Sequence, residues 1–347
     1  PKSTRTRYPG VKIIQTTDWA GMPGTYVLDP QDTLFEKIGR RFIEIQTQLY
    51  GTDHLYDADC FNEVNPPSND TAFIRKIAGS VFKSMTAADP QATWVMQGWF
   101  LFWQKDFWKK PQAEALLGAV PPGKLILLDL YGEKYPVWKE TNSFYGKPWV
   151  WNIICNLGQK VNLSGDLATI YRNFTAATSS PAKGDIKGIG MMMEGFGYNP
   201  VVQEFITDLV WSPEVKSLST WITDYATRRY GRYNEHAATA WKALLQSVYS
   251  YTISEESLIC YTPGEVTPPV SDQNPYGAEY NTAGLFKAAG EMLLAAEPLK
   301  DNENYQFDVV HIMREVLSLN ANRLFAATKQ AADSGNTALF KEKSTAF

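Results

Sequence analysis

The sequence is poor in cysteine, with three in 347 residues. Cys60, Cys155 and Cys260 are odd in number and show no metal-ligand spacing, which argues against a zinc site. Buried thiols or a single disulfide are the simplest interpretation, and the sequence does not decide between them. A chain of this length can bury a substantial core without such cross-links.

Long apolar runs and clusters of basic residues are also missing. No run approaches the roughly 20 apolar residues that span a bilayer, so no membrane span is expected. The net charge of −4 and the lack of a basic run argue against nucleic acid as a partner. Residues 1–7 resemble neither a signal peptide nor a natural start, so we expect a soluble chain that has been processed or truncated.

Three Asn-x-Ser/Thr triplets lie in polar stretches, at Asn69, Asn162 and Asn173. They are candidate N-glycosylation sites, and they are compatible with a lysosomal or secreted protein. Because such triplets are also common by chance, they indicate a compartment without establishing it.

The first 210 residues alternate short apolar runs with amphipathic stretches such as 70–87 and 112–120. This alternation is typical of repeated βα units around a parallel sheet. The predicted strands are 53–61, 93–99, 124–131, 148–155 and 188–193.

Beyond about residue 199 the strand signals fade and helical periodicity replaces them. The sequence therefore predicts an α/β part at 1–210 followed by an all-α domain at 211–347. An irregular segment at 253–280, rich in proline, is long enough to be functional. The predicted helices are 201–209, 215–230, 235–251, 282–297 and 304–333.

Five predicted strands are too few for a closed (β/α) barrel, which needs eight. Either the missing strands belong to a polypeptide that precedes residue 1 and was removed or split from this chain, or the sheet is open.

Polar side chains follow the predicted strands, at the edge where barrel enzymes keep their chemistry. Glu63 follows the first strand, where Pro66 and Pro67 stiffen the exit loop, and Glu194 follows the fifth. Glycoside hydrolysis needs two carboxyl groups, one to protonate the leaving oxygen and one to attack or support the anomeric carbon. Either glutamate alone is most simply a solvated side chain, but the pair is a candidate glycosidase site. Asp129, Glu133 and Asn156 follow other strands.

Aromatic residues make up 13% of the chain. They offer flat faces on which sugar rings can stack, although for any one tryptophan a place in the core is the simpler role.

Several blocks, in order along nearly the whole chain, resemble the α-N-acetylglucosaminidases, the lysosomal heparan sulfate exoglycosidases and their bacterial relatives. The blocks are Gly-Thr-Asp-His at 51–54, Phe-Asn-Glu at 61–63 with prolines at 66–67, Gln-Gly-Trp at 97–99, Leu-Asp-Leu at 128–130, Gly-Met at 190–191 with Glu-Gly at 194–195, and Arg-Arg-Tyr-Gly at 228–231. The resemblance implies the C-terminal part of a (β/α)8 TIM-like barrel plus an α-helical domain that packs over the active site.

The resemblance also implies roles for both glutamates. It places the acid/base on Glu63 and the nucleophile on Glu194, in a retaining, exo-acting enzyme that releases terminal α-linked N-acetylglucosamine. Retention implies carboxyl groups about 5–5.5 Å apart, against about 6.5–9.5 Å for inversion. In this α-linked sugar the 2-acetamido group is cis to the leaving group and cannot reach the opposite face of C1, so the protein must supply the nucleophile.

By the same resemblance, Trp19, Asn62, Trp99 and Asn156 are substrate-binding residues, and Asn156 matches a strand-end position. The neighbours of Asn156 depart from the family. Relatives typically read His-Asn-Phe-Gly-Gly where this chain has Cys-Asn-Leu-Gly-Gln at 155–159. The family's contacts from these changed neighbours are therefore not assigned to this chain.

No cofactor or metal is expected, because two carboxyl groups and water suffice. The expected partners are a glycan substrate and a companion N-terminal fragment that supplies the missing strands, while the sequence leaves open whether the protein forms a homo-oligomer. Two alternatives stay open: a noncatalytic carbohydrate-binding or scaffold protein derived from such an enzyme, and a related exoglycosidase with another sugar preference.

Overall fold

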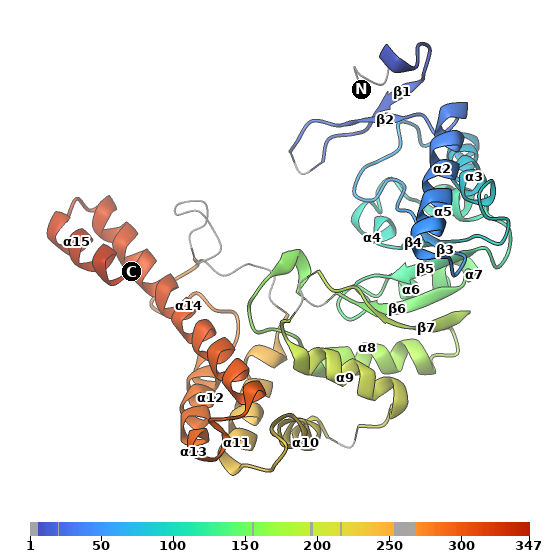
Figure 1. The fold of residues 1–347 in the computed structure, drawn as a ribbon. Helices are drawn as coiled ribbons and strands as arrows, with labels where there is room; N and C mark the ends of the chain where they lie inside the picture. Colours follow the sequence, from blue (N-terminus) through green and yellow to red (C-terminus); the bar gives the residue numbers. More distant parts are fainter. Residues whose placement is uncertain (1–5, 20, 155, 195–196, 216, 253–267) are drawn as a thin grey trace. The chain divides into compact units, whose positions relative to one another are not determined.

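The computed structural model describes residues 6–19, 21–154, 156–194, 197–215, 217–252 and 268–347. The chain forms two compact units: Pro1–Ile153 with Asn173–Gly190, and Ile154–Arg172 with Met191–Phe347. Figure 1 traces the chain through the elements of both units.

A five-stranded sheet forms the centre of the first unit. Its strands are hydrogen-bonded in chain order, and the first four run parallel, with Trp94 opposite Leu125 and Leu127 opposite Trp149. Chain order in a parallel sheet is the topology of repeated βα units, so the predicted α/β part is confirmed. The strands are β3 (Leu55–Asp57), β4 (Thr93–Gln97), β5 (Leu125–Asp129), β6 (Trp149–Ile153) and β7 (Ile186–Met191).

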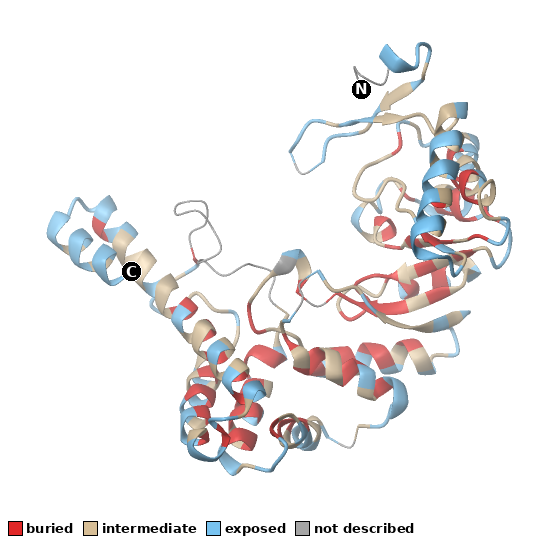
Figure 2. Cartoon of the chain, viewed as in Figure 1, coloured by how far each residue is buried: buried red, intermediate tan, exposed pale blue. Residues whose placement is uncertain are grey.

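The core of this unit lies along the strands. Trp94, Leu127, Trp149 and Trp151 are fully buried, and Figure 2 shows buried residues along the sheet and on the helices of the unit. A parallel sheet is covered on both faces, usually by helices. The helices are α2 (Thr33–Tyr50), α3 (Thr71–Thr86), α4 (Phe100–Trp103), α5 (Lys110–Leu117), α6 (Val137–Glu140), α7 (Asn142–Gly146) and part of α8 (Leu167–Ser179).

Helix α3 illustrates how the sequence sets these elements. The Asp70 side chain accepts a hydrogen bond from Phe73 N–H at 2.8 Å, which satisfies a donor that the first turn leaves free. Ile74, Ile77 and Val81 then fall on one face and are buried.

Before the sheet, the chain forms an antiparallel hairpin that the sequence did not reveal. Strands β1 (Ile13–Gln15) and β2 (Tyr26–Leu28) pair with Ile14 opposite Val27. Strands of three residues carry too little alternation to be recognised. Helices α2 and α8 were also missed.

The second unit is helical, as predicted, apart from its loops. Most predicted helices are found within a few residues of their expected bounds, whereas α15 was missed. Residues 253–267 of the predicted irregular segment lie outside the described residues. The helices are α9 (Pro200–Trp211), α10 (Leu218–Tyr230), α11 (Glu235–Leu245), α12 (Thr282–Leu294), α13 (Ala296–Leu299), α14 (Glu303–Asp333) and α15 (Thr337–Ala346), with 3-10 turns at Leu157–Gln159 and Val248–Ser250.

The Arg-Arg-Tyr-Gly block ends helix α10 and joins it to α14. Arg229 Nε and one terminal nitrogen donate to the two carboxyl oxygens of Asp308 at 2.5 and 2.8 Å, and Tyr230 O–H donates to Asp308 at 2.9 Å. Burial raises the pKa of Asp308, which the bonds from Arg229 and Tyr230 oppose. Gly231 ends the helix with φ 72°, a left-handed conformation that favours glycine. Across the described residues, no helix is long and apolar enough to cross a membrane.

Candidate active site

Glu63 lies in the turn after β3, and both of its carboxyl oxygens are hydrogen-bonded. Trp19 Nε1–H donates to Oε2 at 2.8 Å, and Trp99 Nε1–H donates to Oε1 at 2.9 Å. Trp19 comes from the connection between β1 and β2, and Trp99 follows β4. An indole nitrogen can only donate, so the pair fixes the carboxyl group in one orientation without competing for its proton. We call these three residues the indole clamp.

The backbone of this turn is held from two sides. Phe61 and Glu63 have φ of 63° and 58°, a left-handed conformation that is costly for residues with a side chain. Asn65 anchors the turn, since its N–H donates to Thr17 Oγ1 at 3.0 Å and its Oδ1 accepts from Gln104 Nε2 at 2.8 Å. Neither Thr17 nor Gln104 carries a motif from which the sequence could have identified this role.

Asn62, beside the clamp, has a buried side-chain oxygen, Oδ1, with no hydrogen-bond partner in the described part of the chain. Leaving a buried acceptor unpaired costs about 1–3 kcal/mol, so such groups are rare in folded proteins. Next to a candidate acid, this oxygen is suited to accept a hydrogen bond from a ligand hydroxyl or amide.

An aromatic cluster surrounds the Trp99 side of the clamp. Trp99 stacks on Trp103 with ring centroids 6.0 Å apart and planes inclined by 17°. Trp103 is 59% exposed, so the cluster presents a ring to solvent. Lys134 Nζ lies 5.4 Å from the ring centroid of Tyr135, which adds a positive charge to the same cluster. The cluster consists of Trp99, Phe102, Trp103, Tyr131 and Tyr135.

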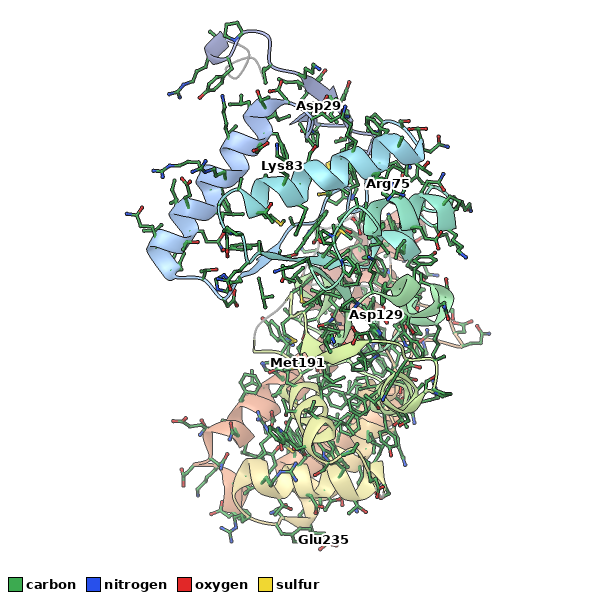
Figure 3. The ribbon with its side chains drawn as sticks, turned by 90° about the vertical axis from the view of Figure 1, so that its right-hand side faces the viewer. Asp29, Arg75, Lys83, Asp129, Met191 and Glu235 are labelled. Carbon is green, nitrogen blue, oxygen red and sulfur yellow. The ribbon has the colours of Figure 1, made fainter. Side chains whose placement is uncertain are left out.

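Two further strand-end carboxyl groups are structural. Burial raises the pKa of Asp129 to about 7, although it accepts backbone hydrogen bonds from Val137 at 3.1 Å and Trp138 at 3.5 Å. Figure 3 shows Asp129 among densely packed side chains, and it is fully buried. Burial likewise raises the pKa of Asp59 to about 6, opposed by the bond it accepts from Gln97 N–H. Both groups hold strand ends rather than face a ligand.

Glu194 belongs to the second unit and follows β7, whose last residue, Met191, is labelled in Figure 3. Its side chain is exposed, and Oε2 accepts a hydrogen bond from Gly158 N–H. Gly158 has φ 69°, a conformation that favours glycine at this position. Because Glu63 and Glu194 lie in different units, the distance between their carboxyl groups stays a prediction.

Asn156 is buried in the loop that carries Gly158. Its Nδ2 donates to the Lys160 carbonyl at 2.7 Å, and its φ is 61°. One donor of the amide is therefore engaged within its own loop, which fixes the orientation of the side chain, and the substrate contact of Asn156 stays a prediction. Its neighbour Cys155, where the sequence departs from the family, lies outside the described residues.

The three candidate glycosylation sites differ in exposure. Asn69 is exposed, whereas Asn162 and Asn173 are buried, and Asn173 Nδ2 donates to the Glu133 carbonyl at 2.7 Å. A glycan on Nδ2 must extend into solvent, so the polar context of the triplets at 162 and 173 was misleading. Asn69 is the candidate that the structure leaves accessible.

Among the described residues, Cys60 is a free cysteine, and burial raises the pKa of its thiol to about 12, which disfavours the nucleophilic thiolate at neutral pH. Cys155 and Cys260 lie outside the described residues. Within the described ranges, no group of three or more His, Cys, Asp or Glu side chains could hold a metal ion.

Comparison with known proteins gives matches over both parts of the chain. Residues 1–213 match the family model of the α-N-acetylglucosaminidase (NAGLU) tim-barrel domain, and residues 221–347 match that of its C-terminal domain. A curated Homo sapiens protein named alpha-N-acetylglucosaminidase is 33% identical over 322 residues, which is 91% of this chain and 43% of that protein. The chain thus spans less than half the length of this relative.

Solved structures share the fold. A family 89 glycoside hydrolase from Clostridium perfringens, in complex with 2-acetamido-1,2-dideoxynojirmycin, has a TM-score of 0.81 at 23% identity, over 99% of this chain and 39% of that chain. A variant of the Clostridium perfringens protein with two glutamates changed to glutamine, in complex with its substrate GlcNAc-alpha-1,4-galactose, has a TM-score of 0.80 with the same coverage.

Proposed function

The chain belongs to the α-N-acetylglucosaminidase family, and from this we propose that it forms part of the catalytic machinery of a retaining exo-glycoside hydrolase. The enzyme would release terminal α-linked N-acetylglucosamine from glycans such as heparan sulfate. The observation that carries this proposal is the indole clamp, which holds a carboxyl group at the exit of a parallel strand beside an aromatic cluster and an unpartnered amide oxygen.

The mechanism assigns Glu194 as nucleophile and Glu63 as acid/base. A carboxyl oxygen of Glu194 attacks C1 as the bond from C1 to the leaving oxygen breaks, and Glu63 gives its proton to that oxygen. Glu63 then takes a proton from water, whose oxygen attacks C1 and releases Glu194. The two indole N–H groups hold the carboxyl group of Glu63 in place while it gives and takes the proton, because a protonated carboxyl oxygen can still accept a hydrogen bond. Two carboxyl groups and water complete this cycle without a cofactor.

Sugar recognition is assigned to residues around the clamp. Asn62 Oδ1 accepts a hydrogen bond from the sugar, while Trp19 and Trp99 form the aromatic wall as well as holding Glu63. Trp19 is 47% exposed, so part of its ring remains available to a ligand. Asn156 is a further proposed substrate contact, and the bond from its Nδ2 to the Lys160 carbonyl orients the amide.

The complete protein would include a further polypeptide segment, continuous with this chain or separate from it. The described sheet has five strands, and a closed barrel has eight. Helix α2 also presents an apolar stripe at helical spacing that the first unit does not cover. Its members, between 40% and 68% exposed, are Ile38, Phe42, Ile45 and Leu49. A lysosomal or secreted location is supported by the exposed triplet at Asn69.

Azide rescue in the complete protein tests both roles. With an activated aryl α-N-acetylglucosaminide, Glu194→Ala and Glu63→Ala should each lower turnover by at least about a thousandfold. Azide should then give the β-glycosyl azide with Glu194→Ala, by direct attack, and the α-glycosyl azide with Glu63→Ala, by attack on the glycosyl-enzyme. Glu204→Ala, which removes a surface partner of Arg228, is the control.

A loss of less than about tenfold on Glu194→Ala would exclude the nucleophile role. If the complete protein binds N-acetylglucosamine glycans but hydrolyses none of a set of aryl α-glycosides, the noncatalytic binding role replaces the enzyme. Faster hydrolysis of an α-glycoside other than the N-acetylglucosaminide would instead identify a related exoglycosidase with another sugar preference.

A further inference from the structure

The position of the Glu194 carboxylate depends on the loop of residues 156–165. Gly158 N–H in this loop donates to Glu194 Oε2. The loop has little regular structure of its own beyond one 3-10 turn, so its position depends on what holds it.

Helix α14 holds the loop through two consecutive residues. Arg314 donates from its guanidinium to the Val161 carbonyl, and Glu315 Oε2 accepts from Leu163 N–H at 3.2 Å. The Asn162 side chain also hydrogen-bonds to Glu315. A cation and an anion thus bind backbone groups on either side of Asn162, which holds this part of the loop against α14.

Glu315 is almost fully buried, at 3% exposure. Burying a carboxyl group is costly unless its oxygens are paired. Here Oε1 accepts from Tyr280 O–H at 2.8 Å while Oε2 binds the loop. An apolar side chain at this position of α14 would cost less free energy to bury. We therefore attribute the carboxyl group at this position to its hydrogen bond with the loop.

Asn199 ties the far side of the loop to the segment that carries Glu194. Its Oδ1 accepts from Ser164 N–H at 3.1 Å, and its Nδ2 donates to the Asn162 carbonyl at 3.0 Å. Asn199 is fully buried and lies five positions after Glu194 in the chain. The loop is therefore fixed to α14 on one side and to the Glu194 segment on the other.

We propose that Arg314 and Glu315 are positioning residues for Glu194 and act through the 156–165 loop; this rests on the proposed role of Glu194 as nucleophile. An attacking oxygen must lie about 3–3.5 Å from the reacting carbon, and a misplacement of about 1 Å can cost about a hundredfold in rate. The helical part of the second unit thus contributes to turnover without touching the sugar.

The first test is steady-state kinetics of Glu315→Gln and Arg314→Gln in the complete protein. Each should lower kcat by roughly 10- to 100-fold while KM changes by less than about threefold, because the nucleophile moves and the sugar contacts do not. The matched controls are Glu291→Gln, which removes a carboxylate paired with His236 on α11, and Arg228→Gln, which removes a cation paired with Glu204. Arg314→Lys, which keeps a donor, should recover part of the loss.

The second test is hydrogen–deuterium exchange of the peptide that covers 157–165, which needs no activity. Exchange should rise in Glu315→Gln and Arg314→Gln, and exchange of α11 and α12 should stay as in the unchanged protein. Unchanged exchange at 157–165, or a rise in KM with kcat retained, would overturn the inference. If Glu194→Ala keeps its activity, the proposed function fails, and the exchange measurement still decides whether the pair holds the loop.

Discussion

Single side chains determine what the carboxyl group of Glu63 can do. Two indole N–H groups hold its oxygens, and neither indole can take or lose a proton at ordinary pH. The two indoles therefore restrict the orientation of the carboxyl group and leave its proton transfer to Glu63 alone. A group that donates a proton to one defined oxygen needs such a fixed orientation.

Replacing either tryptophan by phenylalanine removes an indole N–H but keeps an aromatic ring, and it should therefore lower turnover. We expect Trp99→Phe and Trp19→Phe each to reduce kcat by roughly 10- to 100-fold, because a hydrogen bond to a charged group is worth about 1.5–3 kcal/mol. Steady-state hydrolysis of an aryl α-N-acetylglucosaminide is the measurement. Trp138→Phe is the control, since its indole N–H has no partner among the described residues. Equal kinetics for all three variants would show that the clamp is not used.

Asp129 should make stability depend on pH. With its folded pKa at about 7 and an unfolded value of about 3.9, the folded state keeps a proton that the unfolded state has lost. The free energy of unfolding should thus fall as pH rises from about 4 to about 7, by at most about 1.4 kcal/mol per pH unit.

Denaturant unfolding of the chain at several pH values, compared with Asp129→Asn, measures this slope. The variant should show a flatter dependence, whatever its absolute stability. A slope as steep as that of the unchanged chain would assign the pH dependence to other groups.

At the scale of elements, strand β7 fits against β6 through a glycine. A Cβ on Gly190 would overlap the side-chain oxygen, Oδ1, of Asn152. Asn152 is buried, and its Nδ2 donates to the Val150 carbonyl. Gly188, two residues earlier on the same strand, has nothing within 4 Å of such a Cβ.

Gly190→Ala should therefore cost about 1–3 kcal/mol by overpacking, whereas Gly188→Ala should be neutral or slightly stabilising. Thermal or denaturant unfolding of the two variants measures the difference. In the complete protein, Gly190→Ala should also lower kcat, because Glu194 follows this strand. Similar unfolding midpoints for both variants would contradict the packing of β7 described above.

At the scale of the whole molecule, burial raises the pKa of several described carboxyl groups and lowers that of His311. Burial raises the pKa of Asp59, Asp129, Asp308 and Glu315, and each contributes stability that is lost as pH rises through its folded pKa. His311 affects the pH dependence of stability in the opposite direction. Burial, together with the charges of Arg314 and Arg229, lowers its pKa to about 4. The stability that His311 contributes is therefore lost as pH falls below about 6.5.

Because the folded pKa values of Asp59 and Asp129, about 6 and about 7, lie between pH 5 and pH 7, thermal unfolding should occur at a higher temperature near pH 5 than near pH 7. Differential scanning calorimetry at the two pH values measures the shift. A higher midpoint near pH 7 would mean that His311 and exposed ion pairs outweigh the buried acids. Greater stability in acid would suit the proposed lysosomal location.

Glycosylation also concerns the whole molecule, because it depends on which surface is exposed. When the protein is secreted from eukaryotic cells, we expect a glycan at Asn69 and none at Asn162 or Asn173. Mass spectrometry of peptides with and without glycosidase treatment identifies occupied sites, and Asn69→Gln should remove the glycan mass. Occupancy at Asn173 would require its bond to Glu133 to break.

The sequence by itself determined the class of fold and the places of Glu63 and Glu194 after strands, while their catalytic roles stay predictions. Apolar runs of period two and stripes of period 3.6 are local properties, so β4, β5 and most helices of the second unit were predictable. Very short strands such as β1 and β2 carry too few residues for a period to emerge. Helix α2 shows a clear stripe, but the stripe lies on a face that the described residues leave open.

Only the tertiary structure decided which residues act together. Trp19 and Trp99 meet at Glu63 across 44 and 36 residues of sequence, and Leu163 meets Glu315 across 152. The tertiary structure also distinguished Asp129 from Glu63. Both lie at a strand end, but Asp129 is buried in the sheet. Side chains distant in the sequence become neighbours only when the strands and helices pack, and no local pattern encodes that packing.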